Sequence, residues 1–479
     1  MPTVLDLPPE ILVKAFDYLN LLDLRNIEKV CHAWQRLIKL HFWRTHIQKL
    51  TTHNQKLLTH LETLGWTHDC MDLEIIEKVW LKLQSPSRWE ISAKCREELL
   101  YEYAPRQTRM KVSSCVLFKD KLFVSMIGGN VHSRSSFDFS LRKVLRDIPF
   151  NYNEEEPILL TTPIAIHGNI LVGHISSEET LYLWNAETEE VICQVSLPQS
   201  LRKIYDVRIT KSHIICLASW SLVAWTYVRQ PDETIRVQLG PKIFHDCYDD
   251  SEDSDGVVNV WFETHNLEVN EQFAITHASQ PLLAVYREGP NAGGSKSRSF
   301  LHCRRLCAVS GLGQMSKLNE EQVFQMEIGA ISLSPERYNI LAISVVDEEM
   351  CFRYIVKLIA VPSGEILSHV FDTKYAASEV RIPISWVDNM LFMKLAPRMF
   401  QPSSIPGGED VTLTMWNCET KQEISIDDVQ LVSISDMLMI DHANVVQLYH
   451  RFARVSQAEV EENITNEIHG KVYDFWNTV

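Results

Sequence analysis

The chain of 479 residues has no uninterrupted apolar run long enough to cross a bilayer. Its first ten residues, MPTVLDLPPE, also lack the basic start and the small-residue cleavage site of a secretory signal. We therefore expect a protein of the cytosol or the nucleus. Its eleven cysteines are scattered from Cys31 to Cys418 without paired spacing, which is typical of reduced thiols, so we expect no disulfides.

Basic residues are in the minority. The sequence holds 46 Lys and Arg against 62 Asp and Glu, for a formal net charge of -16. Binding to nucleic acid or to an anionic membrane needs a net of basic groups, so neither is expected as a main partner. Residues 1–50 are an exception, with seven basic and five acidic residues, and the acidity resides in the remainder.

The short motifs of common active sites are missing as well. There is no H-E-x-x-H, no G-x-S-x-G, no P-loop and no G-x-G-x-x-G, and the pair Gly311 and Gly313 is a weak signal. His302, Cys303 and Cys307 lie close in sequence, but zinc requires four ligands and no second pair has a familiar spacing. We expect no catalytic residues, no metal site and no cofactor.

The chain begins with a short apolar segment, LDLPPEILVKAFDYL, at residues 5–19. From Leu7 onward its apolar residues recur every three or four positions, which predicts one stripe of a helix, and Pro9 suits the first helical turn. A second start at Asp23 continues the helical period to Ile38 with a break in the middle, so three short helices are predicted. A unit of about 45 residues rarely buries enough apolar surface to be stable alone, and part of the stripe is expected to dock on something outside it.

These residues resemble the F-box motif, with its order and spacings intact over roughly residues 5–46. The resemblance implies binding to the Skp-type adaptor of a cullin-RING ubiquitin ligase. It is carried by Leu7, Pro8, Glu10, Ile11, Leu12, Phe16, Leu19, Asp23, Leu24, Val30, Cys31, Trp34, Leu37, Phe42 and Trp43.

The resemblance also implies a division of roles among the apolar positions. Phe16 and Leu19 would form the internal core of the motif. The alternative is that the whole stripe is the core of an N-terminal helical bundle. The adaptor-facing positions would be Leu7, Pro8, Ile11, Leu12, Leu24, Val30 and Trp34.

Helical patterning continues over residues 54–103 in three segments, NQKLLTHLETLGW, MDLEIIEKVWLKLQ and SRWEISAKCREELLYEY. None of them is a Gly/Ser-rich tether of the kind that behaves as a random coil. We therefore expect a packed helical linker over 49–108 that fixes the distance between the F-box, 1–48, and the next domain. Alternatively, these helices form a layer that covers one end of that domain.

The period changes after about Met110 to alternating or short apolar runs separated by turn residues, which predicts an all-β antiparallel domain over 109–479. The segment LYLWNAETEEVI at 181–192 aligns without gaps with LTMWNCETKQEI at 413–424, and KLIAVPSGEIL at 357–367 is a weaker copy. Each reads as strand, tight turn, strand.

Repeating hairpins of this kind predict a β-propeller of four-stranded blades. They resemble the outer part of WD repeats, with Trp-Asn in place of Trp-Asp. We expect about seven blades, near 110–150, 157–200, 203–240, 256–327, 328–372, 378–428 and 429–479, with the C-terminal HGKVYDFWNTV as an outer or closing strand.

Two stretches interrupt the strand pattern. YDDSEDSDG at 248–256 is strongly acidic and is expected to be a solvated loop. REGPNAGGSKSRSFLHCRRL at 287–306 is Gly/Ser-rich and basic, and reads as a hairpin tip. As an alternative, its basic residues could contact a phosphorylated or acidic client protein, through Lys296, Arg298, Arg304 and Arg305.

Arginines near the predicted inner strands are the candidate client-binding residues, because the guanidinium group can fork onto a phosphate or a carboxylate. They are Arg202, Arg208 and Arg381. Ordinary surface arginines are the alternative interpretation.

The expected fold class is an α+β multidomain chain, with an all-α F-box and helical linker before an all-β propeller. The resemblance implies the substrate receptor of an Skp-cullin-F-box ubiquitin ligase, in which partner subunits supply the catalysis and this chain is not an enzyme. One alternative is a scaffold that binds the adaptor without ubiquitylation. The other is a propeller enzyme with a site in its channel.

Overall fold

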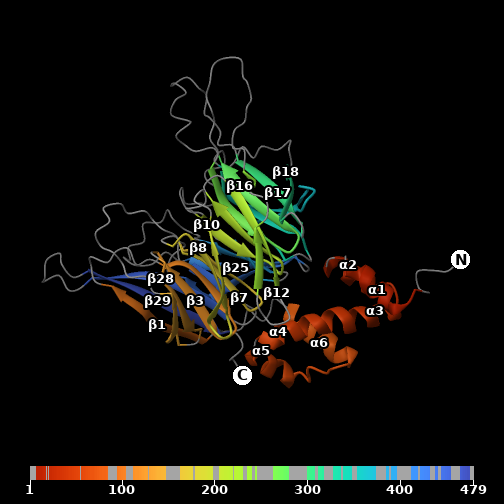
Figure 1. Cartoon of the computed structure of the whole chain (residues 1–479). Helices are drawn as coiled ribbons and strands as arrows, with labels where there is room; N and C mark the ends of the chain where they lie inside the picture. Colours follow the sequence, from red (N-terminus) through yellow and green to blue (C-terminus); the bar gives the residue numbers. More distant parts are fainter. Residues whose placement is uncertain are drawn as a thin grey trace, which may run out of the picture.

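The computed structural model of the chain shows a helical region and a ring of sheets (Figure 1). The described residues are 7–17, 19, 21–53, 55–84, 94–103, 112–127, 129–136, 138–146, 162–175, 178–197, 204–218, 221–229, 235–239, 243–244, 263–279, 299–307, 311–317, 327–335, 338–347, 353–373, 384–387, 390–395, 411–418, 421–431, 437–440, 444–454 and 464–474.

The helical region confirms the three short helices predicted at its start. Pro9 occupies the first turn of the first helix, where its missing N–H leaves no hydrogen bond unmade. The helices are α1 (Pro9–Phe16), α2 (Leu21–Glu28), α3 (His32–Ile38), the π-helix η2 (Lys39–Trp43), α4 (Arg44–His53), α5 (Gln55–Thr63) and α6 (Leu73–Gln84). The predicted limit between residues 48 and 49 therefore falls inside α4. No helix in the described part of the chain is long and apolar enough to span a membrane.

The described strands form seven antiparallel sheets, which we call blades 1 to 7. Blade 1 holds β2 (Val112–Phe118), β3 (Lys121–Met126), β4 (Val131–Ser135) and β5 (Leu141–Arg146); blade 2 holds β6 (Ile164–His167), β7 (Ile170–Ile175), β8 (Thr180–Asn185) and β9 (Glu190–Ser196); blade 3 holds β10 (Ile204–Ile209), β11 (His213–Ala218), β12 (Ser221–Arg229), β13 (Ile235–Leu239) and β14 (Ile243–Phe244).

The sheets of the second half follow the same plan. Blade 4 holds β15 (Glu263–Val269), β16 (Phe273–Ser279), β17 (Ser299–Cys307) and β18 (Gly311–Lys317); blade 5 holds β19 (Glu327–Leu333), β20 (Ile340–Asp347), β21 (Arg353–Ala360) and β22 (Ile366–Thr373); blade 6 holds β23 (Ile384–Val387), β24 (Met390–Leu395), β25 (Val411–Asn417) and β26 (Glu423–Leu431); blade 7 holds β27 (Met437–Ile440), β28 (Asn444–Arg454), β29 (Ile464–Asp474) and β1 (Lys94–Tyr103).

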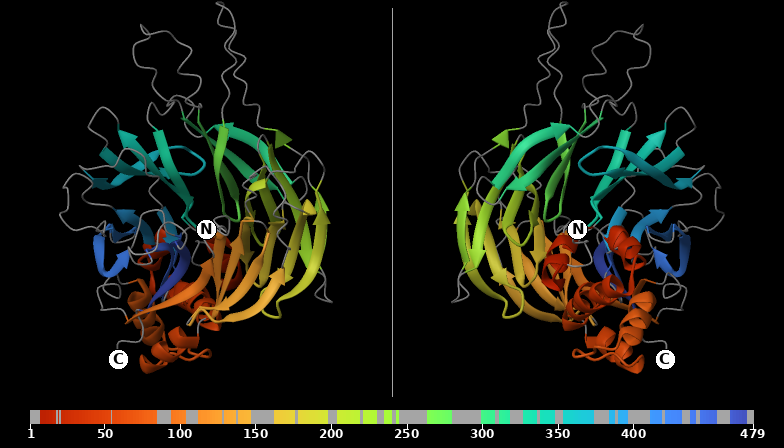
Figure 2. Two further views of the ribbon diagram at one scale, coloured as in Figure 1. Left: turned by 90° about the vertical axis from the view of Figure 1, so that its left-hand side faces the viewer. Right: turned by 90° about the vertical axis from the view of Figure 1, so that its right-hand side faces the viewer.

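The blades are arranged around one axis, as Figure 2 shows from both sides. The first strand of each blade lies at the inside of the ring: β2 contacts β6 and β27, β10 contacts β6 and β15, and β19 contacts β15 and β23. Apolar side chains are buried between neighbouring blades, for example in one cluster that joins blades 2 and 3 and another that joins blades 7 and 1. This is a β-propeller, and the prediction of about seven blades is confirmed.

Blade 7 is completed by a strand from the other end of the chain, which corrects one prediction. The segment expected to form the last linker helix, 87–103, is a strand over Lys94–Tyr103 that pairs antiparallel with β29. Glu, Lys and Leu favour a helix there, but tertiary pairing overrides local propensity because an outer strand only needs one free edge to pair with. The closing strand of the ring is therefore β1, and β29, which contains most of HGKVYDFWNTV, lies between β1 and β28.

The repeated W-N-x-E-T segments both connect paired antiparallel strands, as predicted, and Glu419 and Thr420 of the second copy lie outside the described residues. The side-chain oxygen of Asn185 accepts a hydrogen bond from the backbone N–H of Glu187 at 2.9 Å, which is how an Asx turn replaces a backbone turn. Glu189 has a φ of 61° and donates its N–H to the Asn185 carbonyl. Lys421 repeats this geometry, with a φ of 57° and a 2.8 Å bond to the Asn417 carbonyl.

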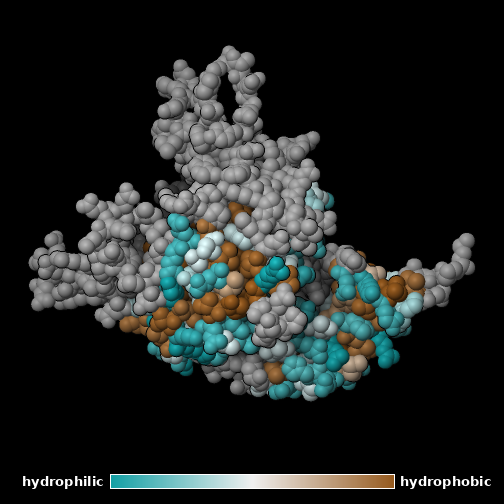
Figure 3. Space-filling view, in the orientation of Figure 1, coloured by the Kyte–Doolittle hydropathy of each residue, from teal (hydrophilic) through white to brown (hydrophobic). Residues whose placement is uncertain are grey.

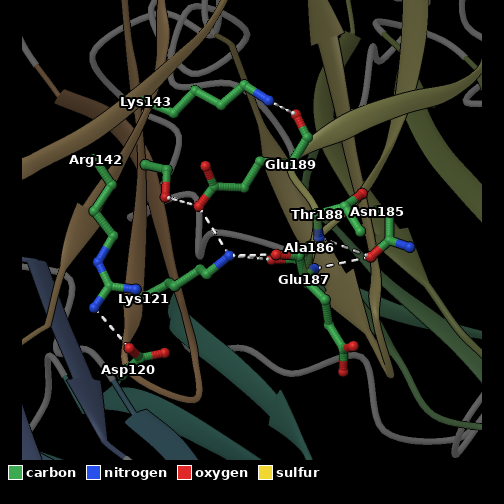
Figure 4. A network of polar contacts seen from close by, with 10 residues as sticks. Asp120, Lys121, Arg142, Lys143, Asn185, Ala186, Glu187, Thr188 and Glu189 are labelled. Atoms are coloured by element: carbon green, nitrogen blue, oxygen red, sulfur yellow. Dashed lines mark hydrogen bonds and ion pairs between the residues drawn. The ribbon is translucent and has the colours of Figure 1, made fainter.

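The turn at Asn185 is also fixed from the neighbouring blade (Figure 4). Lys121 of β3 donates to the backbone carbonyl of Ala186 at 3.1 Å and forms an ion pair with Glu189 at 2.9 Å. Ser133 donates to the same carboxylate, and Lys143 donates to the Glu189 carbonyl at 2.8 Å. These contacts connect blade 1 with blade 2.

The two faces of the ring differ in the length of their connections. First to second strands, and third to fourth strands in blades 1 to 6, are joined by short connections, whereas the long connections, such as 147–163, 245–262, 280–298 and 396–410, join second to third strands or successive blades. Because neighbouring strands are antiparallel, these two sets of connections attach to opposite ends of the strands. We call the two sides the tight-turn face and the long-connection face.

The helical region lies against the tight-turn face. Val79 and Leu83 of α6 belong to one buried apolar cluster with Tyr338, in the turn before β20, and Cys418, in the turn after β25. Both turns are on the tight-turn face of blades 5 and 6. Figures 1 and 2 show the helices on one side of the ring, which leaves the long-connection face on the other.

Candidate functional site

The first candidate site is an exposed apolar surface on the N-terminal helices. The exposed fractions are 43% for Leu7, 49% for Ile11 and 61% for Val30, and Pro8 is exposed as well. Leu7 lies just before α1 and Ile11 lies in its first turn, while Val30 lies in the turn between α2 and α3. Figure 3 shows apolar surface at the outer end of the helical region.

The other predicted adaptor-facing residues are more buried. Leu12 and Leu24 are 5% and 2% exposed and belong to the core of the helical region. Trp34 is half-buried, with its ring edge-on to Phe16 at a centroid distance of 5.4 Å. Phe16 is 5% exposed, which confirms its predicted place in the core. Leu12 and Leu24 therefore belong to the core of the helical region, whereas Leu7, Ile11 and Val30 are exposed.

The second candidate site is the wall of the channel, where only one of the predicted client-binding arginines can be placed. Arg208 lies on the inner strand β10; Arg202 and Arg381 lie outside the described residues. The Arg208 guanidinium donates to the carbonyl of Leu267 at 3.0 Å and to Glu268 at 3.1 Å, and it forms an ion pair with Asp206 at 3.2 Å. One cation thus faces two carboxylates, so acidic groups outnumber basic ones among these three side chains.

The charges in this cluster perturb one another. Burial raises the pKa of both carboxyls, and the Arg208 guanidinium opposes that rise. The Asp206 carboxylate in turn raises the pKa of Arg208. Because the guanidinium is already bonded to Glu268 and paired with Asp206, it is poorly placed to fork onto a phosphate. A client role for Arg208 stays a prediction.

The remaining sequence motifs add little to the site. The acidic stretch 248–256 and the residues Lys296 and Arg298 lie outside the described residues, while 302–307 falls on strand β17 of blade 4. No group of three or more His, Cys, Asp or Glu in the described ranges is arranged to hold a metal ion. The segment 302–307 is therefore part of the sheet of blade 4.

Comparison with known families assigns the N-terminal helices. Residues 4–49 match the model of the F-box-like family. No curated protein matches the sequence of the chain at a significant level. The chain is thus defined as an F-box-like domain joined through packed helices to a seven-bladed propeller.

Solved propellers are similar to this chain only distantly. The structure of U3-55K matches with a TM-score of 0.46 and 11% identity, over 79% of this chain and 98% of that one. The WD40 repeats of RRP9 match at 0.43 and 12%, over 78% and 96%. Hsv2 of Kluyveromyces lactis matches at 0.39 and 10%, over 74% and 95%. Likeness at this level adds nothing to the fold, which rests on the seven sheets themselves.

Proposed function

We propose that this chain is the substrate receptor of an Skp-cullin-F-box ubiquitin ligase. The F-box-like domain docks on a Skp-type adaptor, and the propeller binds a client protein. The ubiquitin chemistry takes place on the partner subunits, so the chain itself is not an enzyme and acts in the cytosol or the nucleus. The observation that supports this proposal is the coincidence of the F-box-like match at 4–49 with exposed Leu7, Ile11 and Val30 in the same small unit.

Exposure of these residues has a physical cost that a partner would remove. Full burial of a leucine, isoleucine or valine side chain contributes about 1.5 to 3 kcal/mol, and these three partly exposed side chains forgo a share of it. A cluster of such side chains on a small helical unit is typical of a docking surface. The small unit that carries them is itself packed, because Leu12 of α1 and Leu24 of α2 are buried in one apolar core.

The propeller supplies a separate surface for the client. The described helices lie on the tight-turn face and leave the opposite face of the ring to the client in this proposal. Connections held by a rigid scaffold are where binding residues concentrate. Docking the adaptor on one side and the client on the other lets both bind at once.

Capture of the adaptor tests the proposal. Val30→Asp places a charge in the exposed apolar surface of the F-box-like domain, and we expect it to abolish co-purification of the Skp-type adaptor. Val228→Asp is the matched control, because Val228 on β12 is also 61% exposed but lies on the propeller. Equal capture of the adaptor by both variants and the wild type would contradict the docking assignment.

A second measurement distinguishes the substrate receptor from the scaffold alternative. Client turnover in cells that express the full chain is compared with turnover in cells whose chain carries Val30→Asp. A receptor accelerates turnover only when it binds the adaptor, whereas a scaffold leaves turnover unchanged.

A further inference from the structure

One continuous helix leads out of the F-box-like domain. The backbone stays helical at both junctions, with φ and ψ of -59° and -47° at Lys39 and of -56° and -49° at Arg44, so α3, η2 and α4 run without a break over His32–His53. The π-helical turn Lys39–Trp43 lies in its middle. Such turns are rare inside helices and are frequent at functional sites.

The π-helical turn directs two successive aromatic residues into two different contacts. The Phe42 ring lies 6.5 Å from Phe16, in the core of the F-box-like domain. The Trp43 ring stacks on Trp80 of α6 with a centroid distance of 4.3 Å and an interplanar angle of 14°. His46, on the next turn, meets the edge of Trp80 at 5.3 Å. The helix is thereby packed against the F-box-like core and α6 at the same point.

Polar contacts fix the same position. Lys39 has a side chain only 6% exposed, and its ammonium group forms an ion pair with Glu77 of α6 at 2.5 Å. The indole N–H of Trp43 donates to Glu28, at the end of α2, at 3.3 Å. The Lys39 side chain is buried whereas Glu77 is 45% exposed, so a rotation of α6 that separated them would leave a largely desolvated ammonium group without its counter-charge, which is unfavourable. We call Lys39, Trp43, Glu77 and Trp80 the interhelical joint.

Helix α6, which carries Glu77 and Trp80 of the joint, is linked to the propeller in two ways. Val79 and Leu83 of α6 share a buried cluster with blades 5 and 6. After α6, the next described element is β1, which pairs with β29 along its length as the outer strand of blade 7. The helical region therefore packs against blades 5 and 6 and leads along the chain to the outer strand of blade 7, and the joint is its connection to the F-box-like domain.

We propose that the interhelical joint holds the F-box-like domain at one fixed angle to the propeller, and that its four residues are positioning residues for ubiquitin transfer to the client. The second half of this statement rests on the proposed function. A client on the propeller is modified efficiently only if its acceptor lies within reach of the ubiquitin-carrying subunit, and a single fixed geometry raises the fraction of time spent there. A loose joint would leave both binding events intact and reduce transfer.

The distance between the two parts gives the direct test. Spin labels are attached to non-natural amino acids at exposed Asp17, in the F-box-like domain, and exposed Glu190, on β9, of the full chain. We expect one narrow distance distribution for the wild type and a broadened or shifted one for Trp80→Ala. Leu81→Ala is the matched control on the same helix, because Leu81 is 47% exposed, and it should leave the distribution narrow. An unchanged distribution in Trp80→Ala would overturn the proposal.

A second pair of variants covers the case in which Trp80→Ala does not fold. Glu77→Gln leaves the Lys39 ammonium without a counter-charge, whereas the double variant Lys39→Met with Glu77→Gln removes both charges. We expect a broadened distribution for Glu77→Gln and a recovery toward the wild type in the double variant. Narrow distributions in all three proteins would equally overturn the proposal.

The role in ubiquitin transfer is measured with the complete ligase and a captured client. For Glu77→Gln we expect wild-type capture of adaptor and client together with several-fold slower ubiquitin transfer. Wild-type transfer despite a broadened distance distribution would overturn the positioning role. Failure of the wild-type chain to capture any adaptor would instead refute the proposed function, and the distance measurement would still decide the joint.

Discussion

Arg134 of blade 1 donates a hydrogen bond to the backbone carbonyl of Leu100, on the closing strand β1, at 3.0 Å. The same guanidinium donates to the Phe139 carbonyl at 2.7 Å and to the Tyr101 hydroxyl at 3.1 Å, and it lies over the Tyr101 ring at 4.1 Å. Arg134 is only 8% exposed. A single buried side chain therefore fastens the strand that completes blade 7 to its neighbour, blade 1.

Replacing this arginine should destabilise the ring. Arg134→Leu leaves the carbonyls of Leu100 and Phe139 without their donor, and we expect a loss on the order of 3 kcal/mol in the free energy of unfolding. Arg142→Leu is the control, because the ion pair of Arg142 with Asp120 is solvent-exposed and such pairs contribute at most about 1 kcal/mol. Urea unfolding measures both variants, and similar losses would show that Arg134 has no special role.

Gly470 of β29 lies at the same boundary and admits no side chain. A Cβ atom at this position would lie 2.6 Å from side-chain atoms of Leu100 and Phe139. We expect Gly470→Ala to destabilise the ring by about 1 to 3 kcal/mol, as overpacking of a tight core does. Leu100→Ala removes a buried side chain and has a cost of its own, so the test is a double-mutant cycle. Crowding predicts that Gly470→Ala costs less in the Leu100→Ala background than in the wild type, and equal costs in both backgrounds would argue against it.

The short helices and the tight hairpins could be predicted because residues close in the sequence determine them. The helices α1 to α3 follow from apolar spacing, and the hairpins at Asn185 and Asn417 follow from a turn whose side chain and backbone conformation are set within five residues. Seven blades follow from repetition of such units. These features need no knowledge of distant partners.

Contacts between distant residues escaped prediction. The strand β1 has a helix-favouring sequence and is extended only because β29 is there to pair with it. The stack of Trp43 on Trp80 shows no local pattern, although Trp43 belongs to the F-box resemblance. The sequence shows Asp206 beside Arg208, but Glu268 comes from the next blade and changes the charge of the site. Sequence periodicity indicates how residues close in the sequence are arranged. It does not indicate which residues far apart in the sequence come into contact.

Removal of β1 tests the corrected limit of the propeller. The ring was predicted to begin at residue 109, and a chain that starts there lacks the outer strand of blade 7 and the Leu100 carbonyl that Arg134 needs. We expect a chain of residues 109–479 to unfold at a lower urea concentration than one of residues 87–479, which retains β1. Both truncated chains expose the same surface of blades 5 and 6, so they differ chiefly in ring closure. Equal midpoints would show that β1 is dispensable.

A buried histidine in blade 2 should make stability depend on pH. His174 of β7 is fully buried, and desolvation lowers its pKa from 6.5 to about 4. Between these two pKa values the unfolded chain binds a proton that the folded chain does not. The contribution of His174 to the free energy of unfolding is therefore complete above pH 6.5 and is lost as the pH falls toward 4. From the two pKa values, the loss between pH 7 and pH 5 is about 2 kcal/mol. His174→Gln cannot titrate, and its free energy of unfolding should fall less over the same interval. Because other groups titrate alike in both proteins, the difference between them isolates His174, and parallel pH profiles would show that the histidine is charged in the folded ring or stays neutral in the unfolded chain.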